Sequence, residues 1–360
     1  MRKFLNVILC IVLALVVIAA AYFAYLMLSY HRLGDQTLAV EEGAQNALQT
    51  DTDYTLLSWN IGFGAYEDDY GFFMDGGTES WAWSEERLRA NLAQIAARIQ
   101  EQAPDLLLLQ EVDSNSTRTY HVNELELLQS ALQDTDLSNV YACNYDSPFL
   151  FYPFHQPHGK SVSGIWTAVQ GKITAANRVS LPVETGLTKF LDLDRCYSVS
   201  RIPLENGKEL CLYNFHLSAY TSDGKIADEQ LELLLADMQR EYEAGNYAIA
   251  GGDFNKDLPE GGSEQYFGVS TEGHNWAQPI RRASFEGTDL TLVPPLDPDD
   301  PVASCRYADG PIRAGQLMVN VDGFIVSDNV EVTDKAVIDT GFENSDHNPV
   351  RLQFRLTEAG

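Results

Sequence analysis

The stretch Tyr247-Ala248-Ile249-Ala250-Gly251-Gly252-Asp253-Phe254-Asn255 combines a strand signal with two polar side chains. Its first four residues predict a short buried strand, and the two glycines end it where the backbone turns or is approached closely. At strand spacing Asp253 and Asn255 point to the same side, so a carboxylate and an amide would share one cleft. Phosphate-ester hydrolysis uses such a pair, although an Asp after Gly-Gly is more often a simple turn residue.

Polar residues recur at the ends of other apolar strands, which strengthens the catalytic interpretation. Glu111 follows four leucines, and ionised acids are rarely buried without a partner or a metal. The other residues in such positions are Asn60, His216, Asp322, Asp346 and His347. Two of them have simpler explanations, because Asn60 can cap a loop and Asp346 can bond the backbone in the turn before Pro349.

The pattern of periodicities predicts an α+β fold with no linker between folded domains. We expect amphipathic helices at 84–103, 123–133 and 226–242, and a loop-rich segment at 257–319. The expected strands are 54–61, 105–112, 165–173, 188–194, 196–204, 210–217, 247–250, 319–326, 330–332 and 350–356.

The N-terminus predicts a membrane anchor. Residues Phe4 to Leu28 are apolar apart from Asn6, which is long enough to cross about 30 Å of hydrocarbon. Arg2 and Lys3 precede them, so the N-terminus is expected in the cytoplasm and the remainder outside it. A cleaved signal peptide is the alternative, because residues 19–21 are alanines, but the apolar run is long for one. We divide the chain into an anchor (1–29), a tether partly helical near 40–48 (30–52) and a catalytic domain (53–357), which we expect to be monomeric.

The composition limits the partners. The formal net charge of the 360-residue chain is -28, which disfavours non-specific binding to nucleic acid. Two aromatic loops, at 63–83 and 145–166, have three open interpretations: they cover the core, line a substrate cleft or touch lipid at the bilayer surface.

Six short motifs resemble, in order and context, the endonuclease/exonuclease/phosphatase superfamily, which includes deoxyribonuclease I and neutral sphingomyelinases. The resemblance covers about residues 52–356 and implies a four-layer α/β sandwich with the site where loops at strand ends meet. The motifs are Ser58-Trp59-Asn60-Ile61, Leu109-Gln110-Glu111, Asn214-Phe215-His216-Leu217, Gly252-Asp253-Phe254-Asn255, Val321-Asp322-Gly323-Phe324-Ile325 and Ser345-Asp346-His347-Asn348-Pro349.

The resemblance also implies roles for these residues. Glu111 would bind Mg²⁺, with Mn²⁺ as the alternative, helped by Asn60 and Asp346. Asp253 would orient or deprotonate the attacking water, and Asn255 would hold a phosphate oxygen. His347 would act as acid/base or phosphate donor with Asp322 accepting its other N–H, and His216 would donate to the phosphate or to the leaving oxygen. Carboxylate and amide oxygens suit a hard cation on physical grounds as well.

The sequence therefore predicts a membrane-anchored, extracytoplasmic, Mg²⁺-dependent phosphoesterase that cleaves a phosphodiester, with a lipid headgroup or another small substrate favoured. An extracytoplasmic nuclease fits the motifs equally and the charge less well. A third alternative is an inactive binding module on the same fold. The segment 164–169 lacks a polar pattern common in the nucleases of the family, and no basic helix for holding duplex DNA is evident.

Overall fold

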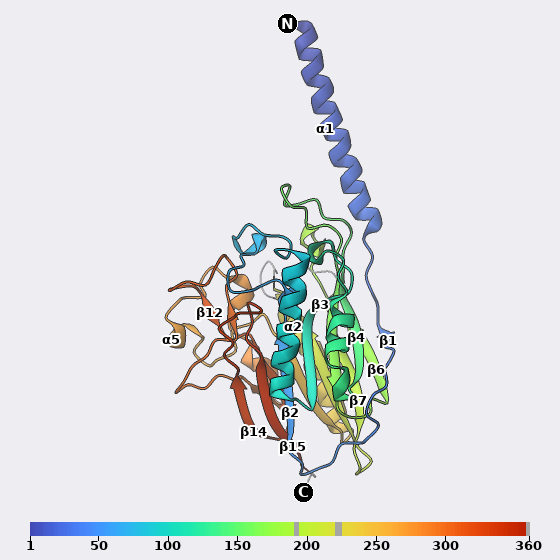
Figure 1. The fold of residues 1–360 in the computed structure, drawn as a ribbon, viewed down its shortest axis with the longest axis vertical. Helices are drawn as coiled ribbons and strands as arrows, with labels where there is room; N and C mark the ends of the chain where they lie inside the picture. The colour runs from blue at the N-terminus through green and yellow to red at the C-terminus, as the bar shows by residue number, and fades with distance from the viewer. Residues whose placement is uncertain (191–193, 220–224, 358–360) are drawn as a thin grey trace.

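Two β-sheets packed face to face, with helices on both outer faces, make up the body of the molecule (Figure 1). The computed structural model describes residues 1–190, 194–219 and 225–357. The first sheet has the strand order β14 (Val330–Val337), β15 (Val350–Leu356), β2 (Tyr54–Asn60), β3 (Leu106–Asp113), β5 (Val162–Val169) and β4 (Ser138–Asp146). The second has the order β1 (Gln36–Thr37), β6 (Ala175–Ser180), β7 (Cys196–Pro203), β8 (Glu209–His216), β9 (Tyr247–Asp253), β13 (Asp322–Ser327) and β10 (Leu290–Val293).

Helices α2 (Glu85–Gln102) and α3 (Glu124–Ala131) cover the first sheet, and α4 (Lys225–Glu243) covers the second. Short elements complete the body: α5 (Glu264–Phe267) and the two-stranded sheet of β11 (Cys305–Arg306) and β12 (Met318–Val319). The α+β four-layer sandwich expected from the sequence is confirmed.

Strand β3 shows why the layers form. Leu107 and Leu109 pack against the apolar stripe of α2, while Leu106 and Leu108 pack into the core between the two sheets. The sequence of a strand that is buried on both faces in this way consists of consecutive apolar residues. Helix α2 begins at Ser84, whose hydroxyl accepts a hydrogen bond from the backbone N–H of Arg87.

Helix α1 (Arg2–Ser29) is the one candidate membrane span among the described residues, with a mean hydropathy of 3.0 and no buried residue in its most apolar window. It projects from one end of the body, and the C-terminus lies at the opposite end (Figure 1). The sequence expectation of a long apolar N-terminal helix is therefore confirmed, while its orientation in a membrane stays a prediction.

Two local predictions are wrong. The segment after α1 contains no helix at 40–48, because it runs extended along the sheets: β1 pairs with β6, and Leu48 is buried in the core between the sheets. The strand expected at 188–194 is wrong at its start, where Leu187–Phe190 is a short 3₁₀ helix, and residues 191–193 lie outside the described residues. Strand β6, which the sequence did not predict, forms the missing neighbour of β7.

Candidate active site

Three neighbouring strands of the second sheet bring an imidazole and two carboxylates together. In the hydrogen-bonded register, His216 of β8 lies opposite Asp253 of β9, and Asp253 lies opposite Asp322 of β13. The Nε2 atom of His216 is 3.4 Å from Oδ2 of Asp253. The pairing of the sheet therefore determines the centre of the site.

The first sheet supplies an amide and a further carboxylate. Asn60 ends β2, and its Nδ2 donates to Oε1 of Glu111 and to Oδ2 of Asp253, each at 3.1 Å. Glu111 lies where the β3–β5 register shifts and has a positive φ of 54°. Bulges of this kind turn a side chain away from the regular pleat. Asn60 thus connects the two sheets across the site.

The turn before β15 adds His347 and Asp346. The Nδ1 atom of His347 lies 2.8 Å from Oδ2 of Asp322, which also accepts from the Ser304 hydroxyl at 2.7 Å. The Nε2 atom of His347 lies 3.8 Å from Oδ2 of Asp253. Asp253 is therefore flanked by two imidazole rings, one of which is held by a second carboxylate.

Asn255 lines the cleft, but not through the strand alternation with Asp253 that the sequence predicted. Strand β9 ends at Asp253, and Asn255 has a positive φ of 48°, so strand alternation does not apply to the pair. The backbone N–H of Asn255 donates to Oδ1 of Asp253 at 2.8 Å, and its side-chain amide donates to the carbonyl of Leu217 at 2.8 Å. Asn255 thus holds Asp253 in place as well as lining the cleft.

The electrostatics separate the two histidines. Burial lowers the pKa of His216 well below its usual value, and the charges of Arg195 and His347 lower it further. Burial also opposes a charge on His347, yet Asp322, Cys305 and Asp346 raise the pKa of this imidazole well above its usual value. Near neutral pH His216 is therefore neutral and His347 carries a positive charge.

The carboxylate between them is also perturbed. Burial raises the pKa of Asp253 to about 7, although the charge of His347 and the hydrogen bonds from Asn255 and Asn60 act in the opposite direction. A carboxylate with a pKa near the working pH can accept a proton and release it again. A pKa of about 7 suits the role of general base that the sequence predicts for Asp253.

The donor set fits a hard cation. Burial raises the pKa of Asp346 to about 6, and the negative charge of Glu111 contributes to the rise. A bound divalent cation would stabilise the ionised form of such a buried carboxylate. Among the described residues, the ligand atoms of two groups lie within 4.8 Å of one another: Asp253, Asp322 and His347, and Cys305, Asp346 and His347. Asn60, Glu111 and Asp346 stay the predicted metal ligands.

The cleft, of about 80 Å³, is lined by seven of the eight residues predicted from the sequence: Asn60, Glu111, His216, Asp253, Asn255, Asp346 and His347. Asp322 lies behind His347. Sequence analysis missed further lining residues, most of them outside the long strands: Tyr66, Asp75, Arg195, Ala219, Trp276, Cys305, Arg306 and Tyr307. Four of these come from the loop-rich segment 257–319, whose irregular sequence carries no period that would have placed them.

Comparisons with solved structures confirm the fold. An endonuclease/exonuclease/phosphatase from Beutenbergia cavernae is 15% identical with a TM-score of 0.58, and the match covers 85% of this chain and 72% of that one. ANGEL2, a 2',3'-cyclic phosphatase, is 17% identical with a TM-score of 0.56, over 89% and 98% of the two chains. The human Nocturnin catalytic domain is 20% identical with a TM-score of 0.52, over 89% and 98%. Comparison with curated protein sequences gives no significant match.

The fold and the site together define a hydrolase of phosphoester bonds. The model of the Endonuclease/Exonuclease/phosphatase family matches residues 57–347. The chain belongs to this family, as the six sequence motifs indicated.

Proposed function

We propose that this chain is a membrane-anchored, extracytoplasmic phosphodiesterase that depends on a divalent metal, with Mg²⁺ favoured and Mn²⁺ as the alternative. The observation that carries the proposal is the position of Asp253, between two imidazoles and two amides and beside the carboxylates of Glu111 and Asp346.

Each side chain then has a distinct task. Asp253 takes a proton from the attacking water, and Asn60 and the backbone of Asn255 fix its orientation. His347 is positively charged and donates to a phosphate oxygen, while Asp322 holds its other nitrogen. His216 is neutral and donates its N–H to the phosphate or to the leaving oxygen, and the Asn255 side chain faces the same cleft.

The metal would be held by Asn60, Glu111 and Asp346. When bound, it would polarise the phosphoryl group and offset the negative charge that develops there. This assignment predicts that chelation removes activity and that added Mg²⁺ restores it.

A nuclease is the second candidate, since the family name includes nucleases and the ANGEL2 structure holds adenosine-2',3'-vanadate. The net charge of -28 argues against a polyanionic substrate. An inactive binding module is the third, and the convergence of so many buried polar groups on Asp253 argues against it.

One set of assays separates the three. The purified full chain in detergent is incubated with bis-p-nitrophenyl phosphate, plasmid DNA and a phosphomonoester, with Mg²⁺ or with a chelator. We expect hydrolysis of the diester in Mg²⁺ and none with the chelator. Cleavage of DNA alone would establish the nuclease, and activity on none of the three would establish the binding module.

A further inference from the structure

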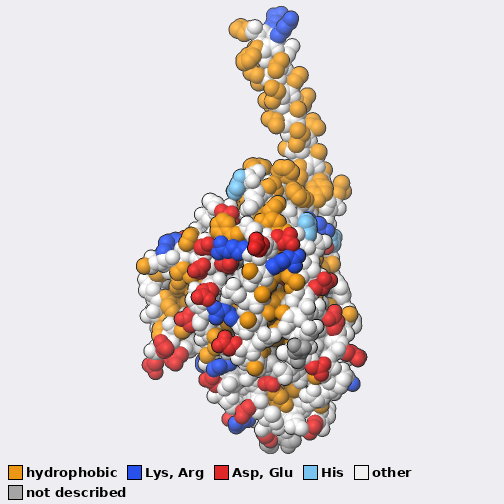
Figure 2. All heavy atoms as spheres, viewed as in Figure 1, with side chains coloured by type: hydrophobic (Ala, Val, Ile, Leu, Met, Phe, Trp, Pro, Cys, Tyr) orange, Lys and Arg blue, Asp and Glu red, His pale blue; other side chains and the backbone are white. Residues whose placement is uncertain are grey.

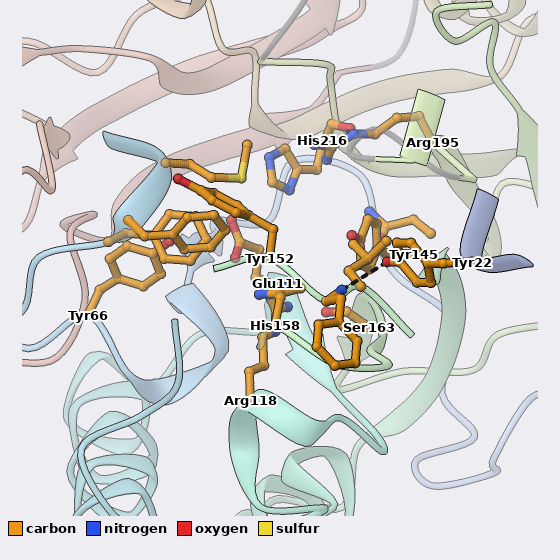
Figure 3. A pocket seen from close by; sticks show the side chains of 16 residues that line it. Tyr22, Tyr66, Glu111, Arg118, Tyr145, Tyr152, His158, Ser163, Arg195 and His216 are labelled. Atoms are coloured by element: carbon orange, nitrogen blue, oxygen red, sulfur yellow. Dashed lines mark hydrogen bonds between the residues drawn. The ribbon is translucent and has the colours of Figure 1, made fainter. Parts of the chain in front are cut away.

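A second pocket, of about 220 Å³, opens directly beside the metal cleft. The two share Tyr66, Glu111, Arg195 and His216. Away from these residues the walls are mainly apolar, with Phe72, Phe73, Met74, Leu150, Phe151 and Tyr152. The polar side chains among them are Arg118, Asn144, His158 and Ser163. Figure 3 shows Glu111 and His216 at the centre, with Tyr66 on one side and Tyr22 on the other. An apolar pocket continuous with a phosphate site is shaped for a substrate that is apolar on one side of its phosphate.

The far wall of this pocket comes from the candidate membrane helix itself. Tyr22 of α1 lines it, and the Tyr22 hydroxyl accepts from the backbone N–H of Phe151 at 2.9 Å. The Tyr25 hydroxyl accepts from the N–H of Phe149 at 3.0 Å. The foot of α1 is therefore fixed to the aromatic loop, which we define as residues 149–154.

The position of this wall places the pocket at a bilayer surface. About 20 helical residues cross the hydrocarbon of a membrane. Counted from Phe4, they end near Phe23, so Tyr22 and Tyr25 fall at the interface where tyrosine is enriched. Phe151, Tyr152 and Phe154 of the aromatic loop are 52%, 63% and 78% exposed. Figure 2 shows a hydrophobic patch at the foot of the helix, where these residues would contact lipid.

The metal cleft has a different character on the side of the loop-rich segment. Asp75, Trp276 and Tyr307 line it, and the two aromatic rings stack with centroids 5.9 Å apart. Aromatic rings beside a carboxylate attract an ammonium group through the ring quadrupole and through charge. Around one phosphate site the structure therefore presents a mainly apolar side next to α1 and an aromatic side that carries Asp75 and Arg306.

We propose that the substrate is a phospholipid with a positively charged headgroup nitrogen, taken from the leaflet at the foot of α1. This inference rests on the proposed function and gives it a substrate class. The glycerol backbone and the first acyl carbons occupy the apolar pocket, and the headgroup lies toward Asp75, Trp276 and Tyr307. The water oxygen forms a new bond to phosphorus and loses a proton, the bond from phosphorus to the glycerol oxygen breaks, and that oxygen takes up a proton. The products are a diacylglycerol and the headgroup phosphate.

A labelling experiment tests the binding without turnover. The full chain is reconstituted in phosphatidylcholine vesicles that contain a phosphatidylcholine with a diazirine near one acyl ester, with a chelator present. After illumination, we expect labelled peptides that include residues 72–74, which line the pocket. Labels confined to α1 and the aromatic loop would overturn the proposal, because those segments meet lipid in any case.

Hydrolysis of lipid vesicles then tests the orientation of the substrate, with its acyl side in the apolar pocket and its headgroup toward Asp75. With Mg²⁺ we expect phosphocholine to be released from phosphatidylcholine vesicles at least tenfold faster than glycerol phosphate from phosphatidylglycerol vesicles. Met74→Trp should fill the pocket. We expect it to lower, at least tenfold, the rate of phosphatidylcholine hydrolysis divided by the rate of bis-p-nitrophenyl phosphate hydrolysis. Leu233→Ser, at an exposed position on α4, is the matched control and should change neither rate.

The outcomes separate this inference from the proposed function. Hydrolysis of bis-p-nitrophenyl phosphate without hydrolysis of phosphatidylcholine would overturn the lipid substrate and leave the phosphodiesterase standing. Release of free choline would overturn the orientation, because the bond on the headgroup side would have broken. Absence of both activities would overturn the proposed function and the lipid reaction with it.

Discussion

Asp253 owes its chemistry to neighbours that are distant in the sequence. Asn60 and the backbone of Asn255 donate hydrogen bonds to its two oxygens, so the carboxylate is fixed in one orientation. The same burial that fixes it raises its pKa to about 7. Orientation and basicity thus have one structural cause, the position of the side chain between the two sheets.

We predict that Asp253→Asn lowers kcat on bis-p-nitrophenyl phosphate at least about 10²-fold, the scale of a lost acid/base group. The amide keeps the size of the side chain but replaces one of the two acceptor oxygens with a donor, so a loss of stability of about 1–3 kcal/mol should accompany the loss of activity. His347→Ala should lower kcat by a similar factor. A variant with kcat within threefold of the unsubstituted chain would have no place in the mechanism.

A buried carboxyl outside the site provides a pH-dependent prediction. Burial raises the pKa of Glu124 well above its usual value, and the charge of Asp113 adds to the effect. Because the folded pKa is the higher one, the contribution of Glu124 to stability is complete below the ordinary Glu pKa and is lost as pH rises through the folded value. As the pH rises from 5 to 8, the unsubstituted chain should therefore lose stability that Glu124→Gln keeps. The difference in the free energy of unfolding between the two should grow by about 1–3 kcal/mol in favour of the variant.

Thermal unfolding of the full chain in detergent at several pH values measures this gain. Glu126→Gln is the matched control, because Glu126 is exposed two residues away on α3 and its replacement should leave the pH dependence unchanged. A constant difference between Glu124→Gln and the unsubstituted chain across the range would contradict the prediction.

At the scale of elements, the predictable parts are those whose side chains alternate or repeat clearly. Strand β3 and helices α2 and α4 were predicted within a few residues because their apolar faces are continuous. Strand β6, with the sequence AANRVS, was missed because four of its six residues are only partly buried. The segment at 40–48 was misjudged because its strand-like contacts are with distant strands, which local periodicity does not reveal.

The residues of the site also divide into those that a periodic sequence pattern locates and those that it does not. Residues at the ends of regular strands, such as His216 and Asp253, were predictable because the strands locate them. Trp276, Cys305 and Tyr307 were not, since they come from the loop-rich segment, in which β11 is only two residues long. Glu111 was predicted correctly in position, but the bulge that turns it into the cleft has no sequence signal of its own.

The β8–β9 pairing makes a sharp prediction about Gly252. A Cβ atom there would lie 2.0 Å from the carbonyl oxygen of Phe215, and the residue has a positive φ of 156°. Gly252→Ala should therefore destabilise the fold by more than about 3 kcal/mol, the range of severe core changes. Gly207→Ala is the control: Gly207 has a φ of 79° and no atom within 4 Å, so only about 1–2 kcal/mol of backbone strain is expected. Thermal unfolding of both variants checks this, and equal losses would contradict it.

At the scale of the whole molecule, helix α1 and the candidate site lie on the same side of the body. Helix α1 is joined to the aromatic loop by two hydrogen bonds from backbone N–H groups to tyrosine hydroxyls, and the pocket behind that loop opens into the metal cleft. A free tether would allow the body to turn away from the membrane. The extended segment after α1 pairs with β6 and limits such rotation, so we expect the cleft to face the bilayer if α1 spans the membrane.

The same arrangement predicts that α1 is kept in the mature protein. Cleavage after the alanines of residues 19–21 would make Tyr22 the new N-terminus. It would also remove most of the apolar helix whose Tyr22 lines one wall of the pocket. Intact-mass analysis of the protein from membranes should therefore show residues 1–29 present, and protease added to intact cells should digest the body while sparing an N-terminal tag. A tag digested as readily as the body, or a mature chain that begins after residue 21, would contradict the predicted anchor and its orientation.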